Sequence, residues 1–402
     1  MTDTVAFPQD RTCPFEPAPG YQTLAEGRPI SEITLYDGRK AWAVTGYALT
    51  RKLLTDPRIS SDRTNPAWPM VSAAAAVEFT ETQKKVIKLL TALVGIDGPR
   101  HRARRKLVQA GFTVRRVDSL RAKIQEIVDG QLDAMIEGGA PADLVSAFAS
   151  PVPLMALCET LGIPHDDQDY FERKAHQILF GPEAAEAYDE LMAYLARLVE
   201  NSSEESFLEA LLAEREATGA TNEVAYEEVL QMFLIVLVTG HDTTSSSIAL
   251  GAYTLLQHPE QLAELRADPS LWLAAVDELT RLVAVPDGLQ RVAAADIEID
   301  EHTTIRKDDG VFFLFSLINR DEDAYAEPDS LDWHRPSFRD HLTYGFGKHQ
   351  CAGMNLARVI MEVAFRTLFE RLPGLRLAVP VEEIPIKPGE AFQGLSKLPV
   401  TW

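Results

Sequence analysis

One unusually long helical segment constrains the fold more than any other feature of this sequence. Apolar residues recur at three-to-four spacing from Asn222 to Gln257, after a plausible N-cap at Thr221 or Asn222 and before Pro259. A helix of about 35 residues extends for roughly 50 Å, which is enough to cross a domain of this size. We therefore expect a helix that runs through the centre of the molecule.

The middle of this helix has a low helix propensity. Residues 239–247 read TGHDTTSSS, and these residue types are poor helix formers. Their hydroxyl groups can bond to carbonyls one turn earlier and open the helical ladder locally. The segment indicates either a core helix with a tolerated weak patch or a helix that is deformed where it passes a ligand.

The remaining pattern is typical of a mainly α fold with a minor β part. Helical periodicity also covers Val117–Ile136, Ala184–Val199, Phe207–Ala217 and Leu271–Val285. Strands are expected within Ile33–Gly46 and Ile297–Phe315, with turns at Asp37-Gly38 and Asp309-Gly310. No repeat or long linker divides the chain, so we expect a single domain over residues 1–402. Its β-rich parts would lie near 25–60 and 285–320 with a C-terminal hairpin, and its helical parts near 62–284 and 352–372.

Charge and composition exclude several classes of protein. The 402 residues carry a formal net charge of -21, which disfavours binding to nucleic acid or to anionic membranes. The apolar run Met232–Val238 is far shorter than the roughly 20 residues of a spanning helix, and the N-terminus does not resemble a signal peptide. Three widely spaced cysteines form no disulfide framework. We expect a cytoplasmic protein that spans no membrane.

The strongest chemical signal surrounds Cys351, in the segment LTYGFGKHQCAGMNLAR that begins at Leu342. Glycines before and after the cysteine let the backbone turn tightly and approach a flat cofactor. A helical pattern begins directly after it, so free N–H groups and the positive end of a helix dipole would point at the sulfur. This arrangement suits a thiolate ligand better than a core thiol.

Residues Tyr344 to Gly353 resemble the heme-binding loop of the cytochrome P-450 family, F-G-x-G-x-H/R-x-C-x-G, with Tyr344 in place of the usual Phe. The resemblance implies a P-450 fold, a triangular helical prism with a long central helix and small β-sheets. It implies heme b as cofactor, with Cys351 as the axial thiolate of its iron. It also implies that His349 binds a heme propionate and that Gly345, Phe346 and Gly353 shape the loop against the heme. The Tyr344 hydroxyl could add a hydrogen bond near the sulfur.

Further family landmarks occur in the right order along the whole chain. Glu278-Leu279-Thr280-Arg281 resembles the E-x-x-R motif, and Arg335 holds the position of the third member of that charge cluster. The resemblance implies that this cluster supports the cofactor loop. It also implies three more propionate partners, which are His101, Arg105 and Arg291. Gly98 stands where proline is frequent in the family.

The weak centre of the long helix resembles the family's A-G-x-D/E-T-T oxygen-binding motif. Asp242 and Thr243 would be the acid and the alcohol that relay protons to bound oxygen. Thr239 replaces the common alanine and could face the substrate or the heme. We expect His241 to point to solvent, with support of the proton path as the alternative.

A local basic region suggests how electrons arrive. Between Gly98 and Val117 there are seven Lys or Arg residues and no acid. Such a run is often only solvated surface, but in this family the same helix borders the cysteine side of the heme. We therefore expect an acidic ferredoxin to dock here by electrostatic steering. The residues expected on this face are Arg102, Arg104 and Lys348, with Arg358 nearby.

The substrate pocket is the least specific expectation. By family analogy it lies among Pro66–Val94, Phe171–Tyr194, the long helix, Val285–Gln290 and Ala391–Phe392, and the expected lining residues are Ile235, Val238, Thr239, Val285, Leu289 and Phe392. These segments are mostly apolar, which suits a medium-to-large lipophilic molecule such as a polyketide, steroid or terpenoid. The chain resembles the soluble bacterial branch that hydroxylates macrolides, statins and vitamin D.

Together these features predict a monomeric monooxygenase that uses O2 and takes electrons from NAD(P)H through a ferredoxin reductase and a ferredoxin. Three alternatives remain at this point. A nitric oxide reductase of the same fold would lack the acid at Asp242. A non-enzymatic heme-binding sensor would need neither the acid–alcohol pair nor a docking face. A helical scaffold would use Cys351 as an ordinary core thiol.

Overall fold

The computed structural model describes residues 7, 9, 11–13, 16–26, 28–70, 81–180, 183–200, 207–217, 219, 224–336, 338–387 and 392–402. Some of the expected features fall outside this range. They are the helix cap at Thr221 or Asn222, parts of the substrate segments Pro66–Val94 and Phe171–Tyr194, and Ala391.

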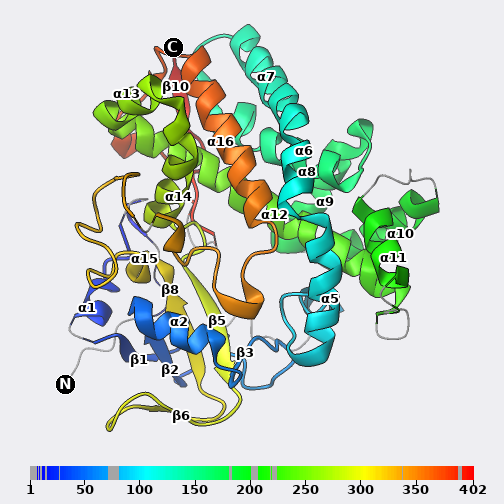
Figure 1. Ribbon diagram of the computed structural model, residues 1–402, viewed down its shortest axis with the longest axis vertical. Helices are drawn as coiled ribbons and strands as arrows, with labels where there is room; N and C mark the ends of the chain where they lie inside the picture. The colour runs from blue at the N-terminus through cyan, green and yellow to red at the C-terminus, as the bar shows by residue number, and fades with distance from the viewer. Residues whose placement is uncertain are drawn as a thin grey trace.

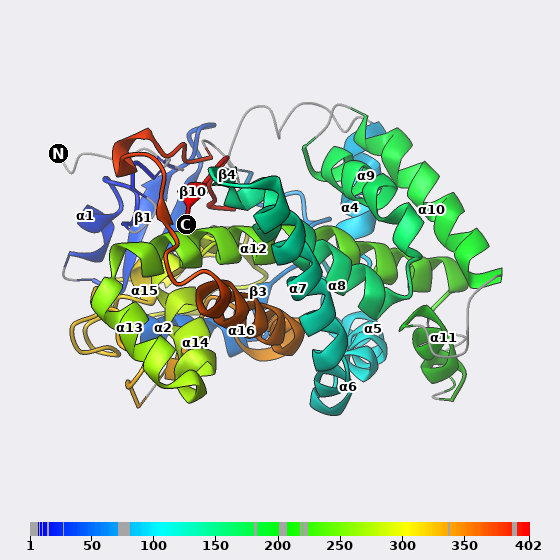
Figure 2. The same ribbon diagram turned by 90° about the horizontal axis from the view of Figure 1, so that it is seen from above.

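The central helix α12 spans Tyr226–Gln257 and runs through the middle of the molecule (Figures 1 and 2). The Glu228 carboxylate accepts the Ala225 N–H at 3.0 Å and closes the first turn. Near its other end, Gly251 lets the Phe365 ring approach so closely that a Cβ would lie 2.4 Å from it. Most side chains of α12 are buried, so tertiary packing around most of its circumference stabilises this long helix.

The predicted opening of α12 is not observed, because the helix is continuous through residues 239–247. The hydroxyl groups do bond back as expected. Those of Thr239, Thr243, Thr244 and Ser247 donate to the carbonyls four residues earlier at 2.6, 3.1, 2.9 and 2.7 Å. These bonds share the carbonyls with the helical N–H groups without breaking the ladder.

The other helices surround α12. They are α1 (Gln22–Ala25), α2 (Tyr47–Thr55), α4 (Glu81–Leu90), α5 (Gly98–Gly111), α6 (Val114–Ser119), α7 (Arg121–Gly138), α8 (Pro151–Leu161), α9 (Gln168–Phe180), α10 (Ala184–Glu200), α11 (Phe207–Ala217), α13 (Pro259–Ala267), α14 (Trp272–Val283), α15 (Phe315–Ile318) and α16 (Met354–Arg371). The expectation of one helix over Val117–Ile136 was wrong, because α6 ends in a tight turn before α7 begins. There the Leu120 N–H bonds to the Val117 carbonyl, a spacing of three residues.

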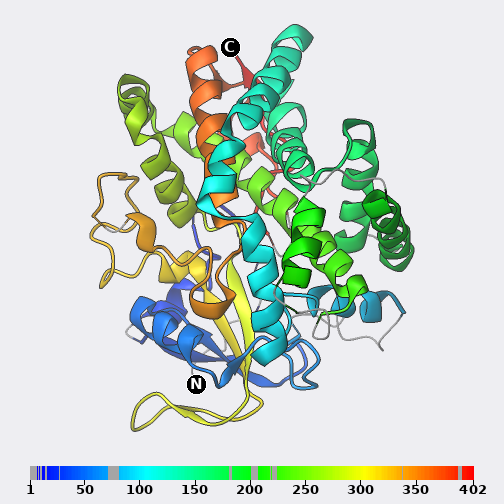
Figure 3. The same cartoon turned by 45° about the vertical axis from the view of Figure 1, so that its right-hand side comes forward.

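The strands of the main sheet lie together at one end of the molecule (Figure 3). Within the described residues, one sheet has the order β1-β2-β8-β5-β3, from strands Ile30–Thr34, Lys40–Val44, Gly310–Leu314, Gly288–Ala293 and Ile59–Ser60. A second sheet joins β4 (Ala142–Asp143), β10 (Pro399–Thr401) and β9 (Arg376–Leu377), and β6 (Ile297–Glu298) pairs with β7 (Thr304–Ile305).

The two predicted turns have different outcomes. The turn at Asp37-Gly38 joins the antiparallel strands β1 and β2, and Gly38 has a φ of 81°. The expected hairpin at Asp309-Gly310 was wrong. Strand β8 begins at Gly310 but pairs with β2 and β5 rather than with β7 before it. Asp309 instead accepts the Trp42 indole N–H at 2.8 Å, which ties this turn to β2.

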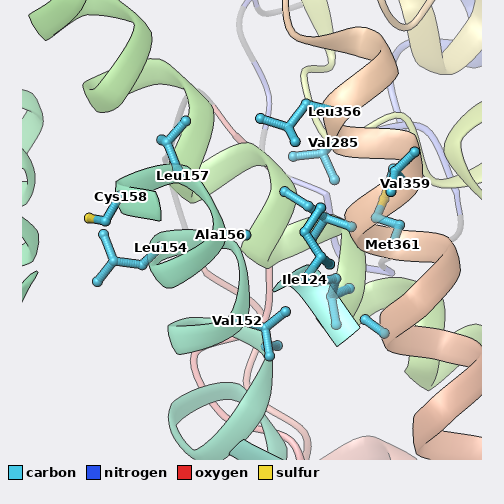
Figure 4. Packing of buried hydrophobic residues seen from close by; sticks show 14 of the residues in the cluster. Ile124, Val152, Leu154, Ala156, Leu157, Cys158, Val285, Leu356, Val359 and Met361 are labelled. Carbon is cyan, nitrogen blue, oxygen red and sulfur yellow. The ribbon is translucent and has the colours of Figure 1, made fainter. Parts of the chain in front are cut away.

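The main hydrophobic core lies where α7, α8, α12, α14 and α16 meet. Figure 4 shows side chains of α8, such as Val152 and Leu154, on one side of this cluster and Val359 and Met361 of α16 on the other. Ile124 of α7 lies between them. The core therefore holds α12 and α16 in a fixed relation, and α16 begins at the cysteine loop.

Helix α12 is also long and apolar enough to cross a membrane by length and composition. However, 67% of its apolar window is buried inside the protein. This burial is what a core helix requires, and a core helix is the role that its packing gives it.

Candidate functional site

The loop before α16 folds Cys351 back toward α2. The Cys351 N–H bonds to the Tyr344 carbonyl at 2.8 Å, and the Gly345 N–H bonds to the Leu342 carbonyl at 2.8 Å. Gly345 and Gly347 have φ values of 70° and 73°, which glycine adopts without strain. A Cβ on Gly347 would lie 3.1 Å from the carbonyl oxygen of Leu54, at the end of α2. The glycines therefore permit both the loop conformation and its close contact with α2.

The Cys351 thiol lies directly before the first turn of α16. Its side chain is exposed, yet the surrounding protein desolvates it enough to raise its pKa. The N–H groups of Gly353 and Met354, at the start of α16, and the charge of Arg105 oppose this shift by favouring the thiolate. By contrast, Cys158 is a core thiol whose pKa burial raises to about 12. Cys351 is thus a reachable sulfur that faces N–H donors and a guanidinium.

Two aromatic residues of the loop lie in different surroundings. Burial raises the pKa of Tyr344, and the charge of Cys351 raises it further. The Tyr344 hydroxyl has no hydrogen-bond partner among the described residues. The suggested hydrogen bond from Tyr344 near the sulfur is therefore not observed. Phe346 packs on the smaller strand-side core, and the Arg51 guanidinium lies 4.5 Å from its ring centroid.

A buried charge cluster supports the loop from behind. Glu278 accepts two bonds from Arg281 at 2.8 Å each and one from Arg335 at 3.0 Å. Arg281 and Arg335 use their other donors on backbone carbonyls between residues 319 and 330. Asn319 then accepts the Leu342 N–H at 2.8 Å, where the cysteine loop begins. The cluster thus connects α14 to the loop through fully satisfied polar groups.

Two guanidinium groups near the site lack an anionic partner. Arg291 of β5 donates to the neighbouring Gln290 carbonyl at 2.7 Å, and burial lowers its pKa to about 10. Burial has the same effect on Arg63, which lies 4.6 Å from the Trp68 ring centroid and whose charge further lowers the pKa of Arg291. Neither forms an ion pair with a carboxylate in the described part of the chain. A bound anion would offset the desolvation and the mutual repulsion of these two neighbouring cations.

The histidines expected at the propionates pack against each other with their ring planes tilted by 36°. The rings of His101 and His349 are 4.0 Å apart between centroids. His349 does not stand free, because its Nε2 lies 2.9 Å from Asp97, which also pairs with Lys348 at 2.8 Å. Burial lowers the pKa of His101 to about 4 and also lowers the pKa of His349. Of the two ring nitrogens of His349, Nδ1 is the one not engaged by Asp97.

These groups fit heme well. A reachable sulfur that faces N–H donors suits an axial thiolate, and two unpaired guanidiniums suit the two propionates. Arg105 adds a buried Nε that has no hydrogen-bond partner among the residues described, and its charge acts on Cys351. The donor set therefore matches a flat, dianionic cofactor that carries a metal.

Helix α5 presents fewer free cations than its sequence indicates. Arg102 is exposed as expected, but Arg104 is only 3% exposed. Its guanidinium bonds to the Thr91 carbonyl at 2.7 Å and pairs with Glu228 of α12. The expectation of Arg104 on a partner-binding face was therefore wrong, because the helix turns this side chain inward, where it satisfies buried carbonyls. The same helix starts at Gly98 with a φ of 73°, a conformation that proline cannot adopt.

Arg358 was also expected near the docking face but is neutralised. It forms a two-point ion pair with Asp277 of α14 at 2.7 and 2.6 Å. Asp277 is only 2% exposed, so this pair links α14 to α16 inside the protein.

One face of α12 remains partly exposed although the helix is otherwise buried. It carries Thr239, Gly240, Asp242, Thr243 and Ser247. Asp242 makes no hydrogen bond or ion pair with any described residue. At the end of this face, Ser247 shares a small hollow with Thr280 of α14. The Thr280 carbonyl accepts the Thr343 hydroxyl at 3.0 Å, so α14 joins the polar face of α12 to the cysteine loop.

His241 neither points to solvent nor lies free to serve a proton path. It is 9% exposed, and its Nε2 lies 3.1 Å from the Ser150 carbonyl oxygen. Ser150 lies between a short π-helix, Val145–Ala149, and α8, and its hydroxyl is 3.3 Å from the same Nε2. The expectation of a solvent-facing histidine was wrong because the opposite face of α12 packs on α8.

The expected pocket residues divide into two groups. Ile235, Val238 and Val285 are at most 3% exposed and belong to the main core. Thr239, Leu289 and Phe392 are partly exposed. Phe392 pairs with Pro286 through a β-bridge, and the Gln393 N–H bonds to the Val285 carbonyl at 2.8 Å. The segment after α14 and the C-terminal turn therefore lie side by side, as the pocket prediction requires.

Two polar residues of the site were missed by sequence reasoning. Arg63 lies in a loop without a recognised motif, and Asp97 immediately precedes the basic run. An acid at a helix N-cap normally indicates a capping role. The sequence therefore gives no sign that Asp97 bonds to His349, 252 positions later. The only available signal was an acid beside seven cations.

Comparison with known proteins gives a consistent result. The sequence matches the family described as Cytochrome P450 over residues 180–390. It is 51% identical to "Pentalenic acid synthase" of Streptomyces avermitilis over 99% of this chain and 97% of that protein. It is 43% identical to "Vitamin D3 dihydroxylase" of Streptomyces griseolus over 100% of this chain and 98% of that protein.

Among solved structures, the mycinamicin VIII C21 methyl hydroxylase MycCI of Micromonospora griseorubida superposes with a TM-score of 0.87 at 33% identity. The match covers 99% of this chain and 100% of that chain. MoxA of Nonomuraea recticatena gives a TM-score of 0.88 at 36% identity, over 99% and 98% of the two chains. These likenesses confirm the predicted P-450 fold. The chain belongs to the cytochrome P450 family and is a heme-dependent monooxygenase.

Proposed function

We propose that this monooxygenase hydroxylates a medium-to-large lipophilic small molecule, inserting one oxygen atom from O2 into a C–H bond. The observation that carries the proposal is the Cys351 thiol, which is exposed and faces the N–H groups that begin α16. Heme bound there supplies oxygen activation, because a thiolate donates electron density to the iron and favours O–O cleavage.

The heme would be held from several sides. Cys351 is its axial ligand in this proposal, and Gly345, Phe346 and Gly353 shape the loop beneath it. His101, Arg105, Arg291 and His349 bind the propionates together with Arg63. The two unpaired guanidiniums support this assignment, because their buried charges are compensated only when an anion is present.

The acid and the alcohol of α12 would deliver protons. Asp242 is partly exposed and free of partners among the described residues, so its carboxylate can exchange a proton with water. The Thr243 hydroxyl donates to the Thr239 carbonyl at 3.1 Å, a bond that orients its lone pairs away from the helix. The pair therefore combines an acid that no described residue binds with an oriented hydroxyl on the same face of α12.

The substrate class follows from the lining and from the relatives. Leu289 and Phe392 are partly exposed apolar residues on adjacent segments, and Thr239 adds one polar point. Relatives bear names such as "Pentalenic acid synthase" and "20-oxo-5-O-mycaminosyltylactone 23-monooxygenase". An apolar lining with few polar groups suits a substrate of the polyketide, steroid or terpenoid type.

Electrons would come from NAD(P)H through a ferredoxin reductase and an acidic ferredoxin. Arg102, Lys106 and Arg115 are exposed, and Lys348 is exposed but paired with Asp97. Val114, at the start of α6, is 61% exposed and adds an apolar contact next to these cations. Such a face can steer an acidic protein and then hold it.

Charge reversal tests this docking face. Arg102→Glu should slow reduction by ferredoxin, whereas Arg376→Glu, on an exposed strand near the C-terminus, should not. Stopped-flow reduction at low and moderate salt measures both. Equal rates for Arg102→Glu and the unaltered enzyme would remove this face from the proposal.

We further propose that the enzyme acts as a monomer in the cytoplasm. Gel filtration with light scattering and fractionation of the producing cell test these two points.

The proposed chemistry is tested by the absorption spectrum of the reduced protein with carbon monoxide, beside a Cys351→Ser variant. A strongly red-shifted Soret band that the variant loses supports the thiolate ligand. Lipophilic candidates are then screened for a shift of the heme spin state and for products one oxygen atom heavier. A heme band at the ordinary position would contradict the assignment of Cys351, and protein without heme would contradict the function.

A further inference from the structure

The carboxylate of Asp97 lies where three segments of the site meet. Its Oδ1 is 2.8 Å from Lys348 Nζ and 2.9 Å from His349 Nε2, both in the cysteine loop. Its Oδ2 accepts the Ser60 hydroxyl and the Ser61 N–H at 2.7 Å each, at the end of β3. Asp97 itself begins α5. One oxygen therefore holds the cysteine loop and the other holds the strand.

This use of Asp97 is unusual for its position. Asp97 is the N-cap residue of α5, where an aspartate usually accepts an N–H of its own helix. Its side chain makes no such bond. All four of its polar contacts reach other segments, and the side chain is 23% exposed, so water weakens them only in part.

These contacts restrict the His349 ring. Its Nε2 is engaged by Asp97, and its face packs 4.0 Å from the His101 ring, which comes from α5. The ring can then present only Nδ1 to a further group. Asp97 thereby fixes the position of the cysteine loop relative to α5, the helix that carries His101 and Arg105.

We infer that Asp97 is a positioning residue for heme. It orients His349 toward the propionate and anchors the Cys351 loop to α5 and β3, so that the cofactor meets a preorganised site. The inference rests on the proposed heme contacts of His349 and Cys351. Residues that orient direct ligands commonly change cofactor affinity by about tenfold or more when they are replaced.

The test compares Asp97→Asn with Ser60→Ala in the holoenzyme. Both variants disturb the same carboxylate, but Ser60→Ala affects only the oxygen that faces the strand. We expect Asp97→Asn to transfer heme to excess apomyoglobin about tenfold faster and to shift the reduction potential, and Ser60→Ala to change the transfer rate less than about twofold. Equal heme loss in the two variants, or a lower melting temperature with unchanged heme loss and potential, would overturn the inference.

A double-mutant cycle asks whether Asp97 acts through His349. In a His349→Phe background, Asp97→Asn should add little to the rate of heme loss. Full additivity would overturn the inference. If Asp97→Asn does not fold, Asp97→Glu enters the same cycle, because it keeps the charge but displaces the oxygens. It should lose heme faster than the unaltered enzyme, but not in the His349→Phe background.

Failure of this inference is separable from failure of the proposed function. Unaltered protein without a red-shifted carbon monoxide band contradicts the function itself. A normal band together with unaffected Asp97 variants contradicts only the role of Asp97.

Discussion

The two sides of α12 are held together by different kinds of interaction. On the side of the cysteine loop, Glu278 and Asp277 are at most 2% exposed and bind arginines through several hydrogen bonds. On the side of α4 and α10, buried apolar residues pack on α12 and the ion pairs lie nearer the surface. Lys88 pairs with Glu227 at 2.7 Å, with side chains 52% and 60% exposed, and Lys85 pairs with Asp189.

The two kinds of interaction contribute differently to stability. A buried, satisfied charge network is costly to break, so it fixes the loop that carries Cys351. Exposed ion pairs each contribute at most about 1 kcal/mol, so on the side of α4 and α10 the buried apolar residues, such as Leu89 and Leu191, hold the helices to α12 more than the charges do.

The largest expected effect concerns the polar face of α12, which lies between these two sides. Asp242→Asn and Thr243→Val should each lower product formation by about 100-fold or more, because proton delivery contributes on that scale. NAD(P)H consumption should fall less, with peroxide as the byproduct. Thr244→Val is the matched control, since its hydroxyl bonds back to Gly240 in the same way but is buried. A loss as large in Thr244→Val would assign the effect to helix packing.

The second prediction compares stability on the two sides. Glu278→Gln should lower the free energy of unfolding by about 3–5 kcal/mol, because it leaves two buried guanidiniums without a counter-charge. Lys88→Met should change it by less than about 1 kcal/mol. Urea unfolding of the heme-bound protein measures both. If the two variants lose similar amounts of unfolding free energy, then the two sides of α12 do not differ in how strongly their charges stabilise the fold.

The third prediction concerns the unpaired guanidiniums. Arg63→Met and Arg291→Met should each speed heme loss by about tenfold, because each removes a charge-assisted bond to a buried anion. Arg58→Met is the control, since Arg58 is exposed and already paired with Asp56 at 2.7 Å. Heme transfer to apomyoglobin provides the rate. If Arg63→Met behaves like Arg58→Met, then Arg63 does not face the cofactor.

The smallest effect is a pH dependence on the cysteine side. Burial lowers the pKa of His101 to about 4, below the ordinary value of 6.5, so the unfolded chain binds its proton first. In protein stripped of heme, the stability should therefore fall as the pH drops from 6.5 toward 4, by at most about 1.4 kcal/mol per pH unit. His101→Gln should flatten this slope and the exposed His302→Gln should not. An unchanged slope in His101→Gln would show that His101 is charged in the folded state.

Local pattern predicted most of the elements. The segments Ala184–Val199 and Phe207–Ala217 match α10 and α11 within one residue, because amphipathic periodicity is a local property. The pairing of β8 with β2 was not predicted, since this parallel pair joins strands that are distant in the chain. The inward turn of Arg104 was also missed, because charge alone does not reveal which face of a helix is buried.

The sequence by itself determined the class of the protein, because the cysteine loop, the E-x-x-R motif and the acid–alcohol pair are each read from a few adjacent residues. Only the tertiary structure decided which polar groups meet. Asp97 joins His349 across 252 positions, Arg63 comes near Arg291, and His241 turns to Ser150 of the neighbouring segment. Such contacts depend on how helices and strands pack, and no local spacing encodes that packing.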